Sequence, residues 1–153
     1  MTAVVSVDDN RLLGDALAVR LAREPEFNWL GCLSSAATVE QRLLELGPDL
    51  ILLDIDMPDL DAFHLMERVA ERLPQTRILV LTGLSRAPDC ERALGLGVWG
   101  YITKGISTPQ LLAAMRRVML GEVVLDEDPT EVLPRAPRPR RSQPRLQRPR
   151  EEG

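Results

Sequence analysis

The sequence predicts an α/β fold, in which a parallel sheet is flanked by helices on both faces. Short apolar runs alternate five times with segments whose apolar residues recur at helical spacing. The run at residues 50–53 is wholly aliphatic, which is typical of a strand that is buried on both faces. Strands that alternate with helices in this way form a parallel sheet with right-handed connections.

Each expected strand is a short apolar run that stops at polar or turn-forming residues. The expected strands are residues 3–7, 29–33, 50–54, 78–82 and 98–103. The third organises the chain, because it runs straight into Asp54 and then into the turn Met57-Pro58-Asp59. Ligands of open α/β sheets bind at the carboxyl ends of the strands, so a site is expected there.

Each expected helix places its apolar residues three or four positions apart, on one face. The helices are expected at residues 12–21, from a cap at Ser34-Ser35 to Gly47-Pro48, at 63–73, at about 88–94, and after Thr108-Pro109 up to 119. Pro25, Pro48 and Pro74 mark three of the helix ends, because proline cannot continue a helix. Together the five strand–helix units predict a flavodoxin-like (βα)5 fold with the strand order 2-1-3-4-5.

Charge and composition divide the chain. Residues 1–133 carry a net charge of −9, whereas residues 134–153 carry +5, with seven arginines, five prolines and no aromatic residue. We therefore expect one domain at 1–121, a linker at 122–133 and a disordered tail at 134–153. The sequence shows no membrane-spanning run, no signal-peptide pattern and no metal-binding cysteine spacing, so a cytoplasmic protein without a membrane partner is expected.

Polar residues stand at the ends of four of the expected strands. They are Asp8, Asp9, Asp54, Thr82 and Lys104. Because the strands are parallel, these side chains should converge on one edge of the sheet. Three carboxylates in one crevice repel one another unless a cation neutralises them, and Mg²⁺ suits such oxygen ligands. A carboxylate can also attack phosphorus, and a metal ion, an ammonium and a hydroxyl can neutralise the oxygens of the transferred group.

Lys104 is the only lysine of the chain, which also contains 18 arginines. A lysine is a compact charge on a slim stem, whereas arginine presents a wide planar fork. A sole lysine at this edge therefore indicates a steric requirement.

At these residues the chain resembles the receiver domain of bacterial two-component response regulators, over residues 1 to about 121. The resemblance rests on several features in order: Asp8-Asp9, Asp54 followed four positions later by Pro58, Thr82-Gly83, and Lys104 at the end of Gly100-Tyr101-Ile102-Thr103-Lys104. It implies that a sensor histidine kinase, or a small phosphodonor, phosphorylates Asp54.

The resemblance also implies a role for each matching residue. Asp8, Asp9, Asp54 and the backbone carbonyl of Asp56 would hold Mg²⁺. Thr82 and Lys104 would contact the phosphoryl group, and Thr82 and Tyr101 would form the switch. The chain would then be a signalling domain that catalyses only its own phosphorylation and dephosphorylation, with an output surface on the fourth helix, the fifth strand and the last helix that includes Trp99 and Tyr101.

The phrases Gly95-Leu96-Gly97-Val98-Trp99-Gly100-Tyr101 and Arg116-Arg117-Val118-Met119-Leu120-Gly121-Glu122 resemble NarL/LuxR-type regulators. Those proteins control transcription through a DNA-binding domain, which we expect to be absent from this chain. The chain would then be a receiver fragment of a longer regulator, a single-domain protein, or a protein whose tail has taken another role. The sequence leaves open whether the chain dimerises. A homodimer would form through either the fourth helix, fifth strand and last helix or the first and last helices.

The chain departs from the family pattern at two positions. Ala62 stands where family members usually have glycine, so the geometry of the turn is expected to differ slightly. Asp56 adds a carboxylate two residues beyond the expected phosphoacceptor. We expect Asp56 to alter the lifetime of the phosphoryl group, a hypothesis that an unchanged dephosphorylation rate in Asp56→Asn would contradict.

Other interpretations of these residues remain open. Asp9 and Asn10 are also good helix caps, and His64, the only histidine, fits a surface or semi-buried position. Asp54-Ile55-Asp56 is similar to the DxD motif of haloacid-dehalogenase-like phosphatases, although it comes late in the chain. The arginines of residues 134–153 could bind DNA through phosphate contacts.

Overall fold

Six parallel strands form one sheet within residues 1–126, the part of the chain that the computed structural model describes. Their order is β2-β1-β3-β4-β5-β6. The strands are β1 (Thr2–Val7), β2 (Phe27–Leu33), β3 (Leu50–Asp54), β4 (Arg77–Thr82), β5 (Gly100–Thr103) and β6 (Val124–Leu125). The expected parallel sheet and the order of its first five strands are confirmed.

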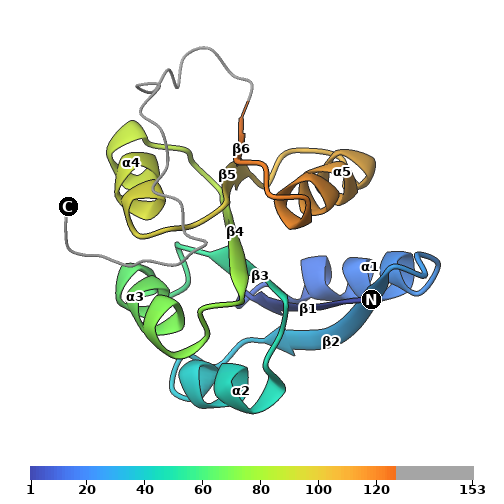
Figure 1. Ribbon diagram of the computed structural model, residues 1–153, viewed down its shortest axis with the longest axis horizontal. Coiled ribbons are helices and arrows are strands. Elements are labelled where there is room, and N and C mark those ends of the chain that lie inside the picture. The colour runs from blue at the N-terminus through green and yellow to red at the C-terminus, as the bar shows by residue number, and fades with distance from the viewer. Residues whose placement is uncertain (127–153) are drawn as a thin grey trace.

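Five helices cover the two faces of this sheet in the described range (Figure 1). They are α1 (Arg11–Leu21), α2 (Val39–Leu46), α3 (Ala62–Arg72), α4 (Ala87–Gly95) and α5 (Thr108–Met119). Helices α1 and α5 lie on one face, and α2, α3 and α4 lie on the other. Among residues 1–126, no helix has the length and apolar character to cross a membrane.

The central strand β3 is buried on both faces, as its aliphatic run predicts. Leu50 and Leu52 belong to the core beneath α1 and α5, whereas Ile51 and Leu53 belong to the core beneath α2, α3 and α4. Successive side chains of a strand point to opposite faces, so an unbroken apolar run fills both cores. All five residues of β3, including Asp54, are buried.

A sixth strand is added to the five that were predicted, and it lies within the range expected to be a linker, 122–133. Val124 and Leu125 pair with Gly100 and Tyr101 and extend the sheet beyond β5. Gly100 permits this close approach, because a Cβ atom there would lie 3.2 Å from the carbonyl oxygen of Val124. The Thr103 N–H also donates to Asp126 Oδ1 at 3.0 Å. Residues 127–153, with the expected tail, lie outside the described residues.

The start of α2 corrects the sequence prediction. Ser34-Ser35 do not cap this helix, which begins at Val39 with Thr38 at its N-cap. The backbone N–H of Thr38 donates to the Ser35 carbonyl oxygen at 3.2 Å, so these residues form a turn before the helix.

Candidate functional site

Four strands deliver polar residues to one edge of the sheet, which we call the rim: Asp8 and Asp9 after β1, Asp54 at the end of β3, Thr82 at the end of β4 and Lys104 after β5. The expected convergence is therefore found. The backbone also ties the rim together, because the Lys104 N–H donates to the Thr82 carbonyl oxygen at 2.9 Å.

Three carboxylates meet at the rim. Asp8, Asp9 and Asp54 each offer one oxygen, and these oxygens lie within 4.8 Å of one another. Asp8 and Asp54 are buried and Asp9 is exposed, so the cluster opens to solvent on one side. Carboxylate oxygens with room for water molecules are the ligands that Mg²⁺ prefers, and this donor set fits that ion.

Lys104 balances the two buried carboxylates. Its Nζ atom lies 2.8 Å from Asp8 Oδ2 and 3.1 Å from Asp54 Oδ2. Burial alone would lower the pKa of Lys104, but the hydrogen bonds to Asp8 and Asp54 outweigh it and raise that pKa. Lys104 therefore remains a cation at the rim.

Asp54 is held on both of its oxygens. Oδ1 accepts the backbone N–H of Asp56 at 2.9 Å, and Oδ2 accepts Lys104 Nζ. Burial raises the pKa of Asp54, and the hydrogen bonds from Asp56 and Lys104 act in the opposite direction. The carboxylate is thus fixed in place with one edge towards Asp8 and Lys104.

Thr82 is engaged by an acidic side chain. Its hydroxyl oxygen lies 3.0 Å from Asp56 Oδ2 and 3.1 Å from the Leu84 carbonyl oxygen. The Gly83 N–H donates to the same Asp56 oxygen at 3.4 Å. Sequence reasoning singled out Asp56 and Thr82 but missed this contact, because only the folded turn shows where the Asp56 carboxylate points.

Tyr101 lies inside the core of the sheet. Its side chain is 1% exposed, so in this conformation it adds nothing to the outer surface where the output residues were expected. Burial raises the pKa of its phenol above the ordinary value, and the nearby acidic groups of Asp89 and Cys90 raise it further. Trp99, its neighbour in sequence, lies beneath the guanidinium of Arg77, at 4.5 Å from the ring centroid.

The turn after β3 contains one residue in the left-handed conformation, Asp59. Asp59 has a φ of 64° and is the one non-glycine residue with positive φ in the described range. Aspartate tolerates this left-handed conformation better than most residues. Ala62 is the first residue of α3, and Asp61 caps that helix by accepting the His64 N–H at 3.0 Å.

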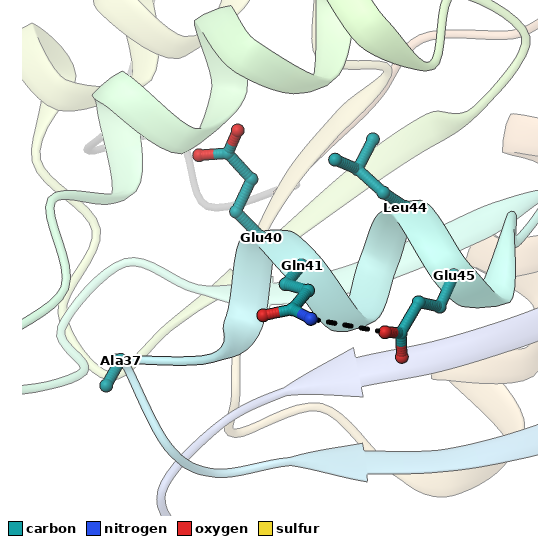
Figure 2. A pocket seen from close by; sticks show the side chains of 5 residues that line it. All are labelled: Ala37, Glu40, Gln41, Leu44 and Glu45. Atoms are coloured by element: carbon teal, nitrogen blue, oxygen red, sulfur yellow. Dashed lines mark hydrogen bonds between the residues drawn. The ribbon is translucent and has the colours of Figure 1, made fainter.

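Two other features lie away from the rim. The His64 side chain is 62% exposed beside Glu67, in agreement with the surface interpretation. A hollow beside α2 is lined by Ala37, Glu40, Gln41, Leu44 and Glu45 (Figure 2). Its polar groups are engaged locally, since Gln41 donates to Glu45 at 3.4 Å and Arg68 of α3 donates to Glu40 at 2.9 Å. Neither feature contributes to the candidate site.

Comparison with known proteins shows which family the chain resembles. Residues 4–116 match the family described as response regulator receiver domain. Response regulator protein VraR of Staphylococcus aureus is 30% identical over 125 residues, which are 82% of this chain and 60% of that protein. The chain therefore spans less than two thirds of the length of this curated relative.

Solved structures share the fold. A two-component response regulator of the LuxR family from Aurantimonas sp. SI85-9A1 superposes with a TM-score of 0.76 at 19% identity, over 86% of this chain and 94% of that chain. The beryllofluoride-activated NtrC4 receiver domain dimer superposes with a TM-score of 0.71 at 23% identity, over 79% and 98% of the two chains.

Proposed function

We propose the following function for this chain, which belongs to the response regulator receiver domain family: Asp54 accepts a phosphoryl group in a reaction that depends on Mg²⁺. One observation carries the proposal. The Asp54 carboxylate lies within a cluster of three acids and is held by Lys104, with Thr82 at the end of the next strand. Phosphoryl transfer needs such positioning and neutralisation of charge more than covalent chemistry.

In the proposed step, a carboxylate oxygen of Asp54 attacks the phosphorus of a phosphohistidine on a sensor kinase. The new P–O bond forms as the P–N bond breaks, and the leaving imidazole nitrogen takes a proton from solvent. Asp8, Asp9 and Asp54, with the Asp56 carbonyl, would hold Mg²⁺, which would neutralise the charge of the carboxylates and the phosphoryl oxygens. Lys104 and Thr82 supply the remaining contacts, and Thr82 with Tyr101 carries the switch.

The output is proposed from the relatives. VraR is a response regulator, and a LuxR-family protein from Staphylococcus aureus that shares the fold is described as a DNA-binding response regulator, so we assign this receiver to the control of transcription. DNA contact would come from a domain outside the described residues. The alternative, a haloacid-dehalogenase-like phosphatase, would turn over many substrate molecules instead of retaining one phosphoryl group on Asp54.

The partner surface for a homodimer is proposed to be the α1–α5 face. Leu12 and Val19 stand on α1 with exposures of 77% and 66%, and a spacing of seven residues puts them on the same side of a helix. The β5 edge, which belongs to the competing surface, is covered by β6. The NtrC4 receiver that shares the fold is described as a dimer.

Intact mass spectrometry after incubation with acetyl phosphate and Mg²⁺ tests the phosphoacceptor. We expect one phosphoryl adduct in the wild type, none in Asp54→Asn and none when the metal is chelated. Asp59→Asn removes the same charge from the exposed turn and is the matched control, which should be phosphorylated normally. An adduct that persists in Asp54→Asn would assign the phosphoacceptor to another residue, and multiple turnover of a phosphate ester would favour the phosphatase.

A further inference from the structure

The carboxylate of Asp56 contacts the part of the site that is expected to respond to phosphorylation. Through its backbone N–H, Asp56 holds Asp54 Oδ1 at 2.9 Å. Its Oδ2 atom, in turn, lies 3.0 Å from the Thr82 hydroxyl oxygen and 3.4 Å from the Gly83 nitrogen. Asp56 therefore links the end of β3 to the junction between β4 and the following loop.

The two donors that meet Asp56 form an anion-binding pair. A hydroxyl and a backbone N–H converge on one negatively charged oxygen, which is the chemical type of a phosphoryl oxygen. Thr82 is fully buried, and its hydroxyl has a single hydrogen to give to either Asp56 or the Leu84 carbonyl. Hydrogen bonds to an ionised acceptor are the stronger ones, so the hydrogen belongs to the Asp56 carboxylate.

Thr82 cannot donate the same hydrogen to Asp56 and to a phosphoryl group on Asp54. We infer that Asp56 is a positioning residue that occupies Thr82 and Gly83 before phosphorylation, so that the phosphoryl group must displace its carboxylate. This inference rests on the proposed role of Asp54. Because residue Asp56 is solvent-exposed, the displaced carboxylate can be rehydrated, and the competition is therefore reversible.

The inference predicts a tighter phosphoryl mimic when Asp56 is removed. Beryllofluoride with Mg²⁺ is titrated into the wild type, Asp56→Ala, Thr82→Val and the double variant, with binding followed by NMR. We expect Asp56→Ala to bind beryllofluoride at least about threefold more tightly than the wild type does. This factor corresponds to the net free energy of one hydrogen bond. In the Thr82→Val background, Asp56→Ala should give a smaller gain in beryllofluoride affinity, because it releases the Gly83 N–H but no hydroxyl. Circular dichroism verifies that every variant is folded.

A second readout reports the contact directly. Without ligand, Asp56→Ala should shift the Gly83 amide and Thr82 methyl signals, whereas Asp59→Asn, which removes a charge from the same turn, should leave them in place. Equal affinity of the wild type and Asp56→Ala would overturn the inference, as would an equal gain in the Thr82→Val background. Failure of every variant to bind beryllofluoride would instead overturn the proposed function itself.

Discussion

Lys104 reaches across the end of β4 to Asp54, with its Nζ atom 3.1 Å from Asp54 Oδ2. The same ammonium lies 2.8 Å from Asp8, so one cation serves two carboxylates whose side chains are only 3% and 5% exposed. Removal of this cation would leave both charges buried without their counterion, which is costly in a protein interior.

Lys104→Met should therefore lower the free energy of unfolding by about 1–3 kcal/mol in metal-free buffer, a value reduced from that of a fully buried pair because Lys104 is partly exposed. Mg²⁺ should restore more stability to this variant than to the wild type, since a second cation then replaces the ammonium. Urea denaturation with and without Mg²⁺ measures both effects. Arg42→Met, which breaks an exposed pair with Glu45, is the control and should cost less than about 0.5 kcal/mol.

Asp9→Asn should distinguish the charge repulsion among the three carboxylates from the part that Asp9 plays in binding Mg²⁺. Without metal, the variant should be at least as stable as the wild type, because it removes one of three neighbouring negative charges. With millimolar Mg²⁺ the wild type should gain thermal stability through binding to the folded state, and Asp9→Asn should gain markedly less. Asp15→Asn changes an exposed acid on α1 and should behave as the wild type. Equal magnesium responses in all three proteins would remove Asp9 from the metal site.

Gly14→Ala should destabilise the protein although alanine favours helices by about 1 kcal/mol. A Cβ atom at Gly14 would lie 2.9 Å from the Cβ atom of Cys32, and overpacking of this kind costs about 1–3 kcal/mol. The Cys32 thiol also donates to the Asp8 carbonyl oxygen at 3.4 Å, so the strain should reach the rim. Gly95→Ala, where a Cβ atom meets open space, should be neutral or slightly stabilising. Thermal denaturation of the two variants provides the comparison.

The Glu26 carboxyl should titrate below its ordinary range. Arg116 Nε donates to Glu26 Oε2, and this hydrogen bond lowers the pKa of Glu26. The contribution of the pair to stability is present above the ordinary pKa and is lost as the pH falls through the lowered pKa. Carboxyl-carbon NMR titration should show the Glu26 pKa return towards its ordinary value in Arg116→Gln. An unchanged pKa in that variant would mean that the pair does not persist in solution.

The α1–α5 dimer is tested by charge insertion. Leu12→Glu with Val19→Glu should abolish dimerisation of the beryllofluoride-loaded protein, because a carboxylate at each position cannot enter an apolar interface. Light scattering measures the mass in solution. The matched control, Leu84→Glu, changes a side chain that is 60% exposed in the loop after β4. Loss of the dimer in the control alone would move the interface to the side of the domain that carries the loop between β4 and α4.

The sequence was sufficient to predict the sheet and the residues that form the rim. Apolar runs determine the strands, and the rule that parallel strands share a carboxyl edge brings Asp8, Asp54, Thr82 and Lys104 together. The second helix began later than predicted, since serines that favour caps also favour turns. The two-residue strand β6 was not predicted because it is too short to show a period. Its backbone also approaches Gly100 closely, since a Cβ atom there would lie 3.2 Å from the Val124 carbonyl oxygen.

The contact between Asp56 and Thr82 could not be predicted either. It depends on the register of β3 and β4, in which Asp54 pairs with Leu81, so that Thr82 extends one residue beyond Asp54. It also depends on a turn in which Asp59 adopts positive φ. The spacing of residues in the sequence predicts neither the register nor the conformation of the turn.

Strand β6 also decides where the last described residue, Asp126, lies. Because β6 runs parallel to β5, the backbone returns to the rim after α5, and Asp126 receives the N–H of Thr103, the residue before Lys104. Asp126 therefore lies at the rim beside Thr103, and a ligand attached to it through a short flexible linker would have an effective concentration in the ~millimolar range. A weak ligand attached in this way would be a strong competitor at the rim, with no increase in its intrinsic affinity.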